Sequence, residues 1–108
     1  MSSAICFQKS QRKLSVQMRA VLMILEADPY LKNMLSPHID LDLESIRWDR
    51  IFQFRLSSGH STAVSWLYGI WTDEPRPRSN VFDGSLNLTP KLQAAILNAL
   101  ALRWGLAA

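Results

Sequence analysis

The stretch TPKLQAAILNALALRW, residues 89–104, decides the fold. Its threonine offers a capping hydroxyl directly before a proline, and proline suits the first turn of a helix because its missing N–H would have no partner there. No helix breaker follows until Gly105. The stretch therefore predicts a helix, in which only Lys91 and Arg103 are charged.

The apolar side chains of this helix are spread around much of its circumference. A terminal helix of a monomer usually keeps one polar face toward water. Because this helix has so little polar surface, we expect a partner chain to cover part of it. The expected interface residues are Leu92, Ile96, Leu97, Leu100 and Trp104.

A second helix is predicted in LSVQMRAVLMILEA, residues 14–27, with Ser15 as its N-cap. Apolar residues recur at helical spacing and extend well around the cylinder, which indicates burial on more than one side. A shorter helix is predicted at 29–35. There Asp28 can cap the start, a proline suits the first turn, and a Ser-Pro pair follows the end.

The segment 38–56 supports two interpretations. It begins HIDLDLES, where polar and apolar residues alternate as in a strand, yet Asp42 could equally cap a helix that starts at Leu43. We expect extended backbone up to Leu41 and a helix afterwards. A short strand pair within the segment is the alternative.

Turn chemistry at 57–59, read SSG, precedes a third long helix that Ser58 or Ser61 can cap. Few of its positions are polar, which places it in the core. The helix should end in the loop TDEPRPRSN, residues 72–80, where prolines and charges gather, and the Asp-Gly pair at 83–84 predicts a further turn.

These elements predict a mainly α protein, built as a small irregular bundle of four to five helices with short connections. The length of 108 residues suits one domain with a single core. We expect residues 1–13 to form a flexible basic N-terminal arm and residues 14–108 to form a single globular helical domain.

The cellular setting is inferred from cysteine content and hydropathy. The single cysteine, Cys6, cannot form an internal disulfide, which fits a reducing compartment. The first residues lack the charged start and apolar run of a secretory signal, and the longest apolar run, residues 20–25, is too short to cross a bilayer. We therefore expect a cytoplasmic protein that does not enter a membrane.

The net charge of +3 is unevenly distributed. Lys9, Arg12, Lys13 and Arg19 precede any acidic residue, whereas acidic residues crowd the middle of the chain. One interpretation is a solvated basic arm, and the other is contact with nucleic acid through these four residues. The helix that follows the SSG turn does not resemble a DNA-recognition helix, because it carries no arginine or lysine for base edges.

The stretch LSSGHSTAVSW, residues 56–66, resembles the signature loop of ABC-type ATPases. No GxxxxGK[ST] motif accompanies it, so ATP binding is not expected. A capped helix start is one interpretation, and an anion site at Ser58, Gly59 and His60 is the other. Ser58 beside His60 does not predict a nucleophile with its base, because sequence neighbours rarely point at each other and no GxSxG elbow is present.

The best metal candidates are His38, Asp40, Asp42 and Glu44, which would share one face of an extended strand. Neighbours on such a face lie roughly 6 to 7 Å apart, so they cannot all reach one ion unless the strand bends. A solvated strand or helix cap explains the same residues. No metal or cofactor is therefore expected.

The number of large apolar residues indicates the class of function. A chain of this length must accommodate four tryptophans, Trp48, Trp66, Trp71 and Trp104, besides its apolar helices. Such a small domain leaves much apolar surface exposed, which favours association as a homo-oligomer or as an assembly factor. Nucleic-acid binding by the basic arm is the alternative. An enzyme is the least supported class, because no convincing reactive constellation is visible.

Overall fold

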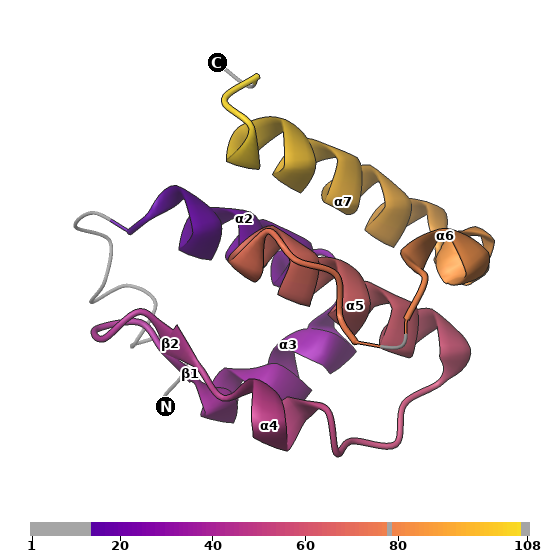
Figure 1. Ribbon diagram of the computed structural model, residues 1–108, viewed down its shortest axis with the longest axis horizontal. Coiled ribbons are helices and arrows are strands. Elements are labelled where there is room, and N and C mark those ends of the chain that lie inside the picture. The colour runs from indigo at the N-terminus through magenta and orange to yellow at the C-terminus, as the bar shows by residue number, and fades with distance from the viewer. Residues whose placement is uncertain (1–13, 78, 107–108) are drawn as a thin grey trace.

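The computed structural model describes residues 14–77 and 79–106. It is 66% helical, with six α-helices and one two-stranded antiparallel sheet in the described ranges (Figure 1), which confirms the predicted mainly α class. The elements in chain order are α2 (Val16–Glu26), α3 (Pro29–Leu35), η1 (Ser36–His38), β1 (Ile39–Asp40), β2 (Ser45–Ile46), α4 (Trp48–Ile51), α5 (Ser58–Thr72), α6 (Val81–Gly84), η2 (Ser85–Asn87) and α7 (Pro90–Arg103).

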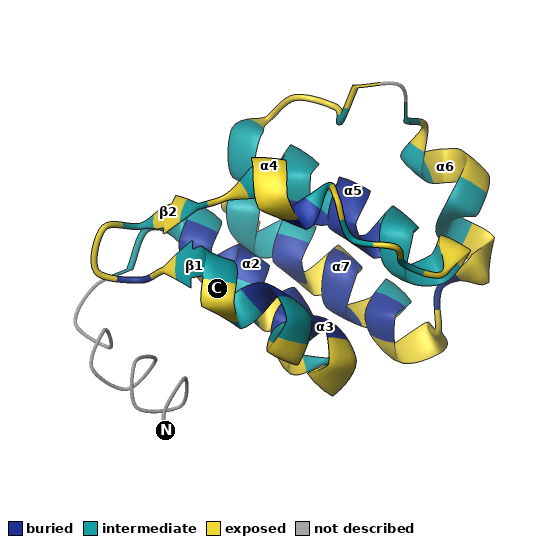
Figure 2. Cartoon of the chain, turned by 90° about the horizontal axis from the view of Figure 1, so that it is seen from below, coloured by how far each residue is buried: buried dark blue, intermediate teal, exposed yellow. Residues whose placement is uncertain are grey.

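The core lies where α2, α5 and α7 meet. Helix α2 packs against both of the others, so two of its sides are buried, as its wide apolar surface predicts. The buried faces of the three helices turn toward one another (Figure 2), and α5 and α7 begin at the same end of the molecule, beside α6 (Figure 1). The core side chains of these helices are Met18, Ala20, Val21, Ile24, Leu25, Ala63, Val64, Leu67, Ile70, Leu92, Ala95, Ile96 and Ala99.

Side-chain caps start α2, α3, α5, α6 and α7, and three of these caps are the predicted ones. Each of these three predicted caps accepts a hydrogen bond from the backbone N–H three residues later. The distance is 3.1 Å for the Ser15 hydroxyl, 3.1 Å for the Asp28 carboxylate and 3.2 Å for the Thr89 hydroxyl. The prediction for α5 was wrong by one residue or more. Ser57 is in extended backbone and caps this helix, which leaves Ser58 and Ser61 inside it.

The extended backbone expected before Leu41 and the alternative strand pair are both confirmed, but the helix expected from Leu43 with Asp42 as its cap starts later, as the short helix α4. Strands β1 and β2 form a hairpin with Ile39 opposite Ile46. Glu44 adopts a positive φ of 51°, which no α-helix accommodates, and its carboxylate accepts from the backbone N–H of Ser15 at 3.1 Å. This tertiary bond links the hairpin to the start of α2.

The connection from α5 to α7 begins as predicted. Helix α5 ends at Thr72, and the proline-rich loop follows. The Asp-Gly turn predicted at 83–84 is instead the end of the short helix α6, which Asn80 caps. Gly84 has no room for a side chain, because a β-carbon there would collide with the hydroxyl of Thr62 on α5. The close approach of α6 to α5 therefore depends on this glycine.

Within the described ranges, no helix combines the length and apolar character that crossing a bilayer requires. The predicted basic arm, residues 1–13, lies outside the described residues.

Candidate functional site

An apolar groove runs between α5, α6 and α7. Its larger part has a volume of about 580 Å³ and lies between the second half of α5, the 73–80 connection and the end of α7. A second part of about 260 Å³ continues along α7 toward η2. The two parts are adjacent, because Trp66 and Leu100 line both of them, and none of their lining residues comes from α2.

Large apolar side chains form both the floor and the rim of the groove. Trp66 and Leu100 are half-buried and pack against the core. Phe82, which is 77% exposed, meets the Trp66 ring edge to face at 6.1 Å. Leu97 on α7 is 68% exposed, and Trp104, which follows the last residue of α7, is 64% exposed. Leu97 and Trp104 were expected at an interface from the sequence, whereas Phe82 was not.

Arg103 fixes one end of the groove. Its Nε donates to the carbonyl oxygen of Ile70 at 2.9 Å, and its Nη2 lies 2.6 Å from Oδ2 of Asp73. The first bond satisfies a carbonyl in the last turn of α5, where no intrahelical N–H is available. Arg103 thereby ties the end of α7 to the end of α5.

Replacing Arg103 with alanine should lower the free energy of unfolding by about 1 to 2 kcal/mol, because the charged donor to a helix-end carbonyl is lost. Asp73→Asn is the matched control. It should cost less than about 1 kcal/mol, because the Asp73 side chain is mostly exposed. Urea titration of both variants, followed by circular dichroism, checks this ranking, and equal losses would contradict it.

The predicted interface residues have two different environments, the core and the groove. Leu92 and Ile96 are buried in the core that α7 shares with α2 and α5, which corrects their assignment to an outer interface, although Ile96 also borders the floor of the groove. Leu97, Leu100 and Trp104 line the groove. The apolar residues of α7 extend around the helix because one set packs inside the chain and the other faces outward.

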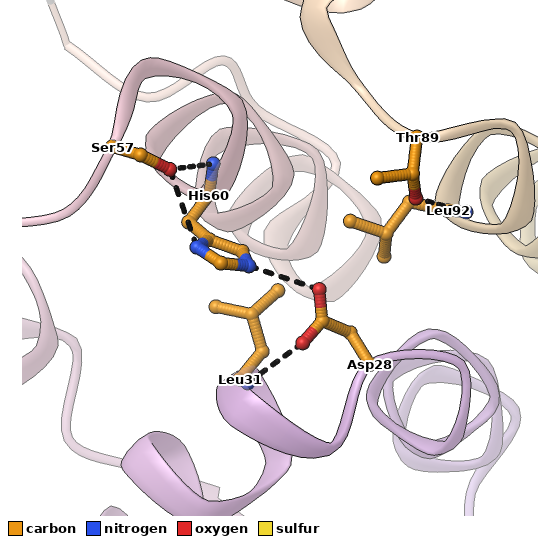
Figure 3. Close-up of polar contacts among 6 residues, drawn as sticks. All are labelled: Asp28, Leu31, Ser57, His60, Thr89 and Leu92. Carbon is orange, nitrogen blue, oxygen red and sulfur yellow. Dashed lines mark hydrogen bonds and ion pairs between the residues drawn. The ribbon is translucent and has the colours of Figure 1, made fainter.

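A second candidate site lies where α3 and α5 begin (Figure 3). His60 bridges the two helix starts: its Nδ1 lies 3.2 Å from Oγ of Ser57, and its Nε2 lies 2.9 Å from Oδ2 of Asp28. The ring of Tyr30 stacks on the imidazole at a centroid distance of 4.9 Å. A serine, a histidine and an aspartate thus form one hydrogen-bonded chain.

The predicted anion site borders this chain. Ser58, Gly59 and His60 form the first turn of α5 and line a cavity of about 270 Å³ that extends to the start of α7 at Thr89. The hydroxyl that contacts the imidazole belongs to Ser57. The serine considered next to His60 from the sequence, Ser58, is therefore not its partner.

No protein-family model, curated protein or solved structure matches this chain. Function is therefore inferred from its own side chains.

The metal candidates do not converge. Strand β1 ends at Asp40, and the chain then turns, so His38, Asp40, Asp42 and Glu44 no longer share one face. The Asp40 carboxylate accepts from a backbone N–H of the turn, and the His38 ring lies against Phe54. Among the described residues, no group of three or more histidine, cysteine or acidic side chains is placed to hold a metal ion.

The basic residues are only partly described. Arg19 is exposed on α2, whereas Lys9, Arg12 and Lys13 lie outside the described residues, so nucleic-acid contact stays a prediction. Arg76 of the proline-rich loop, in contrast, is turned inward. Its guanidinium lies 4.3 Å from the centre of the Phe52 ring, and burial lowers the pKa of this group from its ordinary value.

Proposed function

We propose that this chain acts through protein–protein association, by pairing with a second copy of itself along the groove between α5, α6 and α7. The observation that supports the proposal is the groove itself, whose two adjacent parts share Trp66 and Leu100 and whose rim exposes Phe82, Leu97 and Trp104. Large contiguous apolar patches are rare on soluble monomers and are typical of interaction surfaces.

The energetics favour burial of this rim. Covering one large apolar side chain is worth roughly 1.5 to 3 kcal/mol, and tryptophan is among the residues that dominate binding energy at interfaces. Leu97, Leu100 and Trp104 follow one another at intervals of three and four along α7, which is the spacing that brings side chains onto one face of a helix. A second helix can pack along such a face.

Self-pairing is supported by the combination of a ridge and a depression on one surface. The exposed side chains of α7, Leu97 and Trp104, project beside the hollow that Trp66 and Leu100 share. In a two-fold pair, the ridge of each copy meets the hollow of the other, so both are covered at once. Association with a different protein is the other form of this proposal. The single cysteine, Cys6, fits a reducing compartment, so we propose that the pairing takes place in the cytoplasm.

Light scattering after size-exclusion chromatography, over a range of protein concentrations, tests self-pairing. The wild-type chain should elute as an oligomer whose mass falls on dilution. The double variant Leu97→Asp with Trp104→Asp should elute as a folded monomer, because both side chains are exposed and their loss leaves the core intact.

Leu43→Asp is the matched control for this variant. Leu43 is 77% exposed but lies in the β-hairpin turn, outside the groove, so this change should leave the oligomer unaffected. A wild-type chain that is monomeric at every concentration would exclude self-pairing, and an oligomer that survives the double variant would exclude the groove as its interface.

A further inference from the structure

The chain of Ser57, His60 and Asp28 is arranged as a nucleophile, its base and the group that orients the base (Figure 3). We propose that it is a hydrolytic site for small esters, with Ser57 as the nucleophile. Such constellations are recognised by the geometry and roles of their members and not by the order of the residues in the sequence. The proposal does not depend on self-pairing, because Ser57, His60 and Asp28 do not line the groove, although Leu88 borders both the groove and the cavity beside this site.

The hydrogen-bond partners of His60 favour the tautomer that this role requires. Asp28 accepts at Oδ1 from the backbone N–H of Leu31, and its Oδ2 lies 2.9 Å from Nε2 of His60. An ionised carboxylate only accepts, so Nε2 carries the proton of the neutral imidazole and Nδ1 is left as an acceptor. The Ser57 hydroxyl, 3.2 Å away, can donate to it. The oxygen of that hydroxyl also accepts from the N–H of His60, which uses a lone pair and not the proton.

The base is held in position before any substrate binds. Its two ring nitrogens are both engaged, and one face of the ring is covered by Tyr30. The His60 and Asp28 side chains are 27% and 15% exposed, so solvent competes little for their hydrogen bond. Ser57, in contrast, is exposed and can be reached by a substrate. Positioning of this kind is what a general base requires.

The neighbouring cavity defines the substrate class. It has a volume of about 270 Å³, and Leu88 and Leu92 give it an apolar wall that suits a short acyl chain. Ser58 and Gly59 occupy the first positions of α5, where a backbone N–H has no intrahelical carbonyl to bond. Such N–H groups stabilise the negative oxygen of a tetrahedral intermediate. A β-carbon at Gly59 would lie 3.0 Å from the carbonyl oxygen of Asn87. Glycine therefore lets the first turn of α5 lie close to the backbone of Asn87.

The reaction proceeds in two balanced halves. Oγ of Ser57 bonds to the ester carbonyl carbon while Nδ1 of His60 takes the hydroxyl proton. The bond from that carbon to the alcohol oxygen then breaks, and the alcohol leaves with the proton from Nδ1. Water attacks the acyl-Ser57 in the same way, with His60 as its base, and the carboxylic acid is released as Ser57 regains its proton.

Hydrolysis of p-nitrophenyl acetate and labelling by a fluorophosphonate probe, mapped by mass spectrometry, test the proposal. Acylation and labelling should occur at Ser57. Ser57→Ala and Ser57→Asn should each lower the acylation rate by about 100-fold or more. The asparagine variant keeps a side-chain cap for α5, so its loss of activity would not come from an uncapped helix.

Asp28→Asn gives a readout that a purely structural role would not produce. Its carbonyl oxygen can still cap α3, but its amide N–H₂ would donate to Nε2, which moves the imidazole proton to Nδ1 and removes the acceptor for Ser57. The acylation rate should fall by about 100-fold or more while the melting temperature changes little. Ser61→Ala, one turn further along α5, should retain the wild-type rate because Ser61 does not line the cavity.

Three results would overturn the proposal. The first is labelling at another serine, and the second is a wild-type rate no higher than that of the urea-unfolded chain. The third is full activity in folded Ser57→Asn. None of these depends on the oligomeric state, so the site and the groove are tested separately.

Discussion

Replacing Ile24 with alanine should lower the free energy of unfolding by about 2 to 5 kcal/mol, the range measured for large-to-small changes in well-packed cores. Ile24 is fully buried on α2, in the cluster that this helix shares with α5 and α7. The replacement would leave a cavity beside α2. Because α5 and α7 both pack against α2 already, this cavity cannot close unless a helix moves. The cost should therefore exceed the transfer free energy of the lost methylene and methyl groups.

Met23→Ala is the matched control, since it removes a side chain of similar size from the adjacent position of α2. Met23 is 36% exposed, so its replacement should cost less than half as much as that of Ile24. Urea titrations followed by far-ultraviolet circular dichroism measure both, at one fixed protein concentration, because association would add concentration-dependent stability. Equal losses at the two positions would show that α2 is not buried as described.

Replacing Asp28 with alanine should lower the free energy of unfolding by about 2 to 3 kcal/mol. The Asp28 carboxylate caps α3, and a cap of this kind contributes about 0.5 to 2 kcal/mol. It is also the acceptor for Nε2 of His60, and leaving a shielded donor without a partner costs about 1 to 3 kcal/mol. Since the two contributions share one side chain, their sum overestimates the loss.

Asp28→Asn removes the negative charge but keeps a group that can cap α3 and bond to His60, so it separates the effect of the charge from the effects of the cap and the hydrogen bond. Asparagine caps helices as well as aspartate does, and its amide can still bond to the imidazole, so most of the stability should remain. Thermal melts of both variants and of His60→Ala provide the comparison. If Asp28→Ala has the same melting temperature as the wild-type chain, the link between α3 and α5 contributes nothing to the stability of the fold.

Helix starts were the part of the fold that the sequence predicted best. Ser15, Asp28 and Thr89 were identified as caps, and each accepts from an N–H three residues later. This success has a local cause, because a cap and its donor are separated by less than one turn of chain. The cap of α5 was misplaced because three serines compete for that role within five residues, and local chemistry does not distinguish them.

The β-hairpin shows where local patterns fail. Asp42 was a plausible helix cap, but the chain turns at Glu44, whose left-handed backbone is compatible with a hairpin and whose carboxylate bonds to Ser15. These partners are separated by 29 residues. A bond across that distance exists only when α2 and the hairpin are already packed together, so no sequence window contains the signal.

The same reason explains why the candidate catalytic residues were missed. Ser57 and Asp28 each cap a helix through local contacts, but His60 and Asp28 are 32 residues apart, and only the tertiary fold brings the starts of α3 and α5 together.

For this protein, the sequence by itself determined the helical class, the starts of three helices and the excess of apolar surface on α7, because propensity, capping and periodicity act between neighbours along the chain. The tertiary structure decided which apolar residues of α7 enter the core and which line the groove. It also decided that Ser57, His60 and Asp28 meet. Those outcomes depend on helix packing, which sums many contacts between distant residues and is not encoded at any single position.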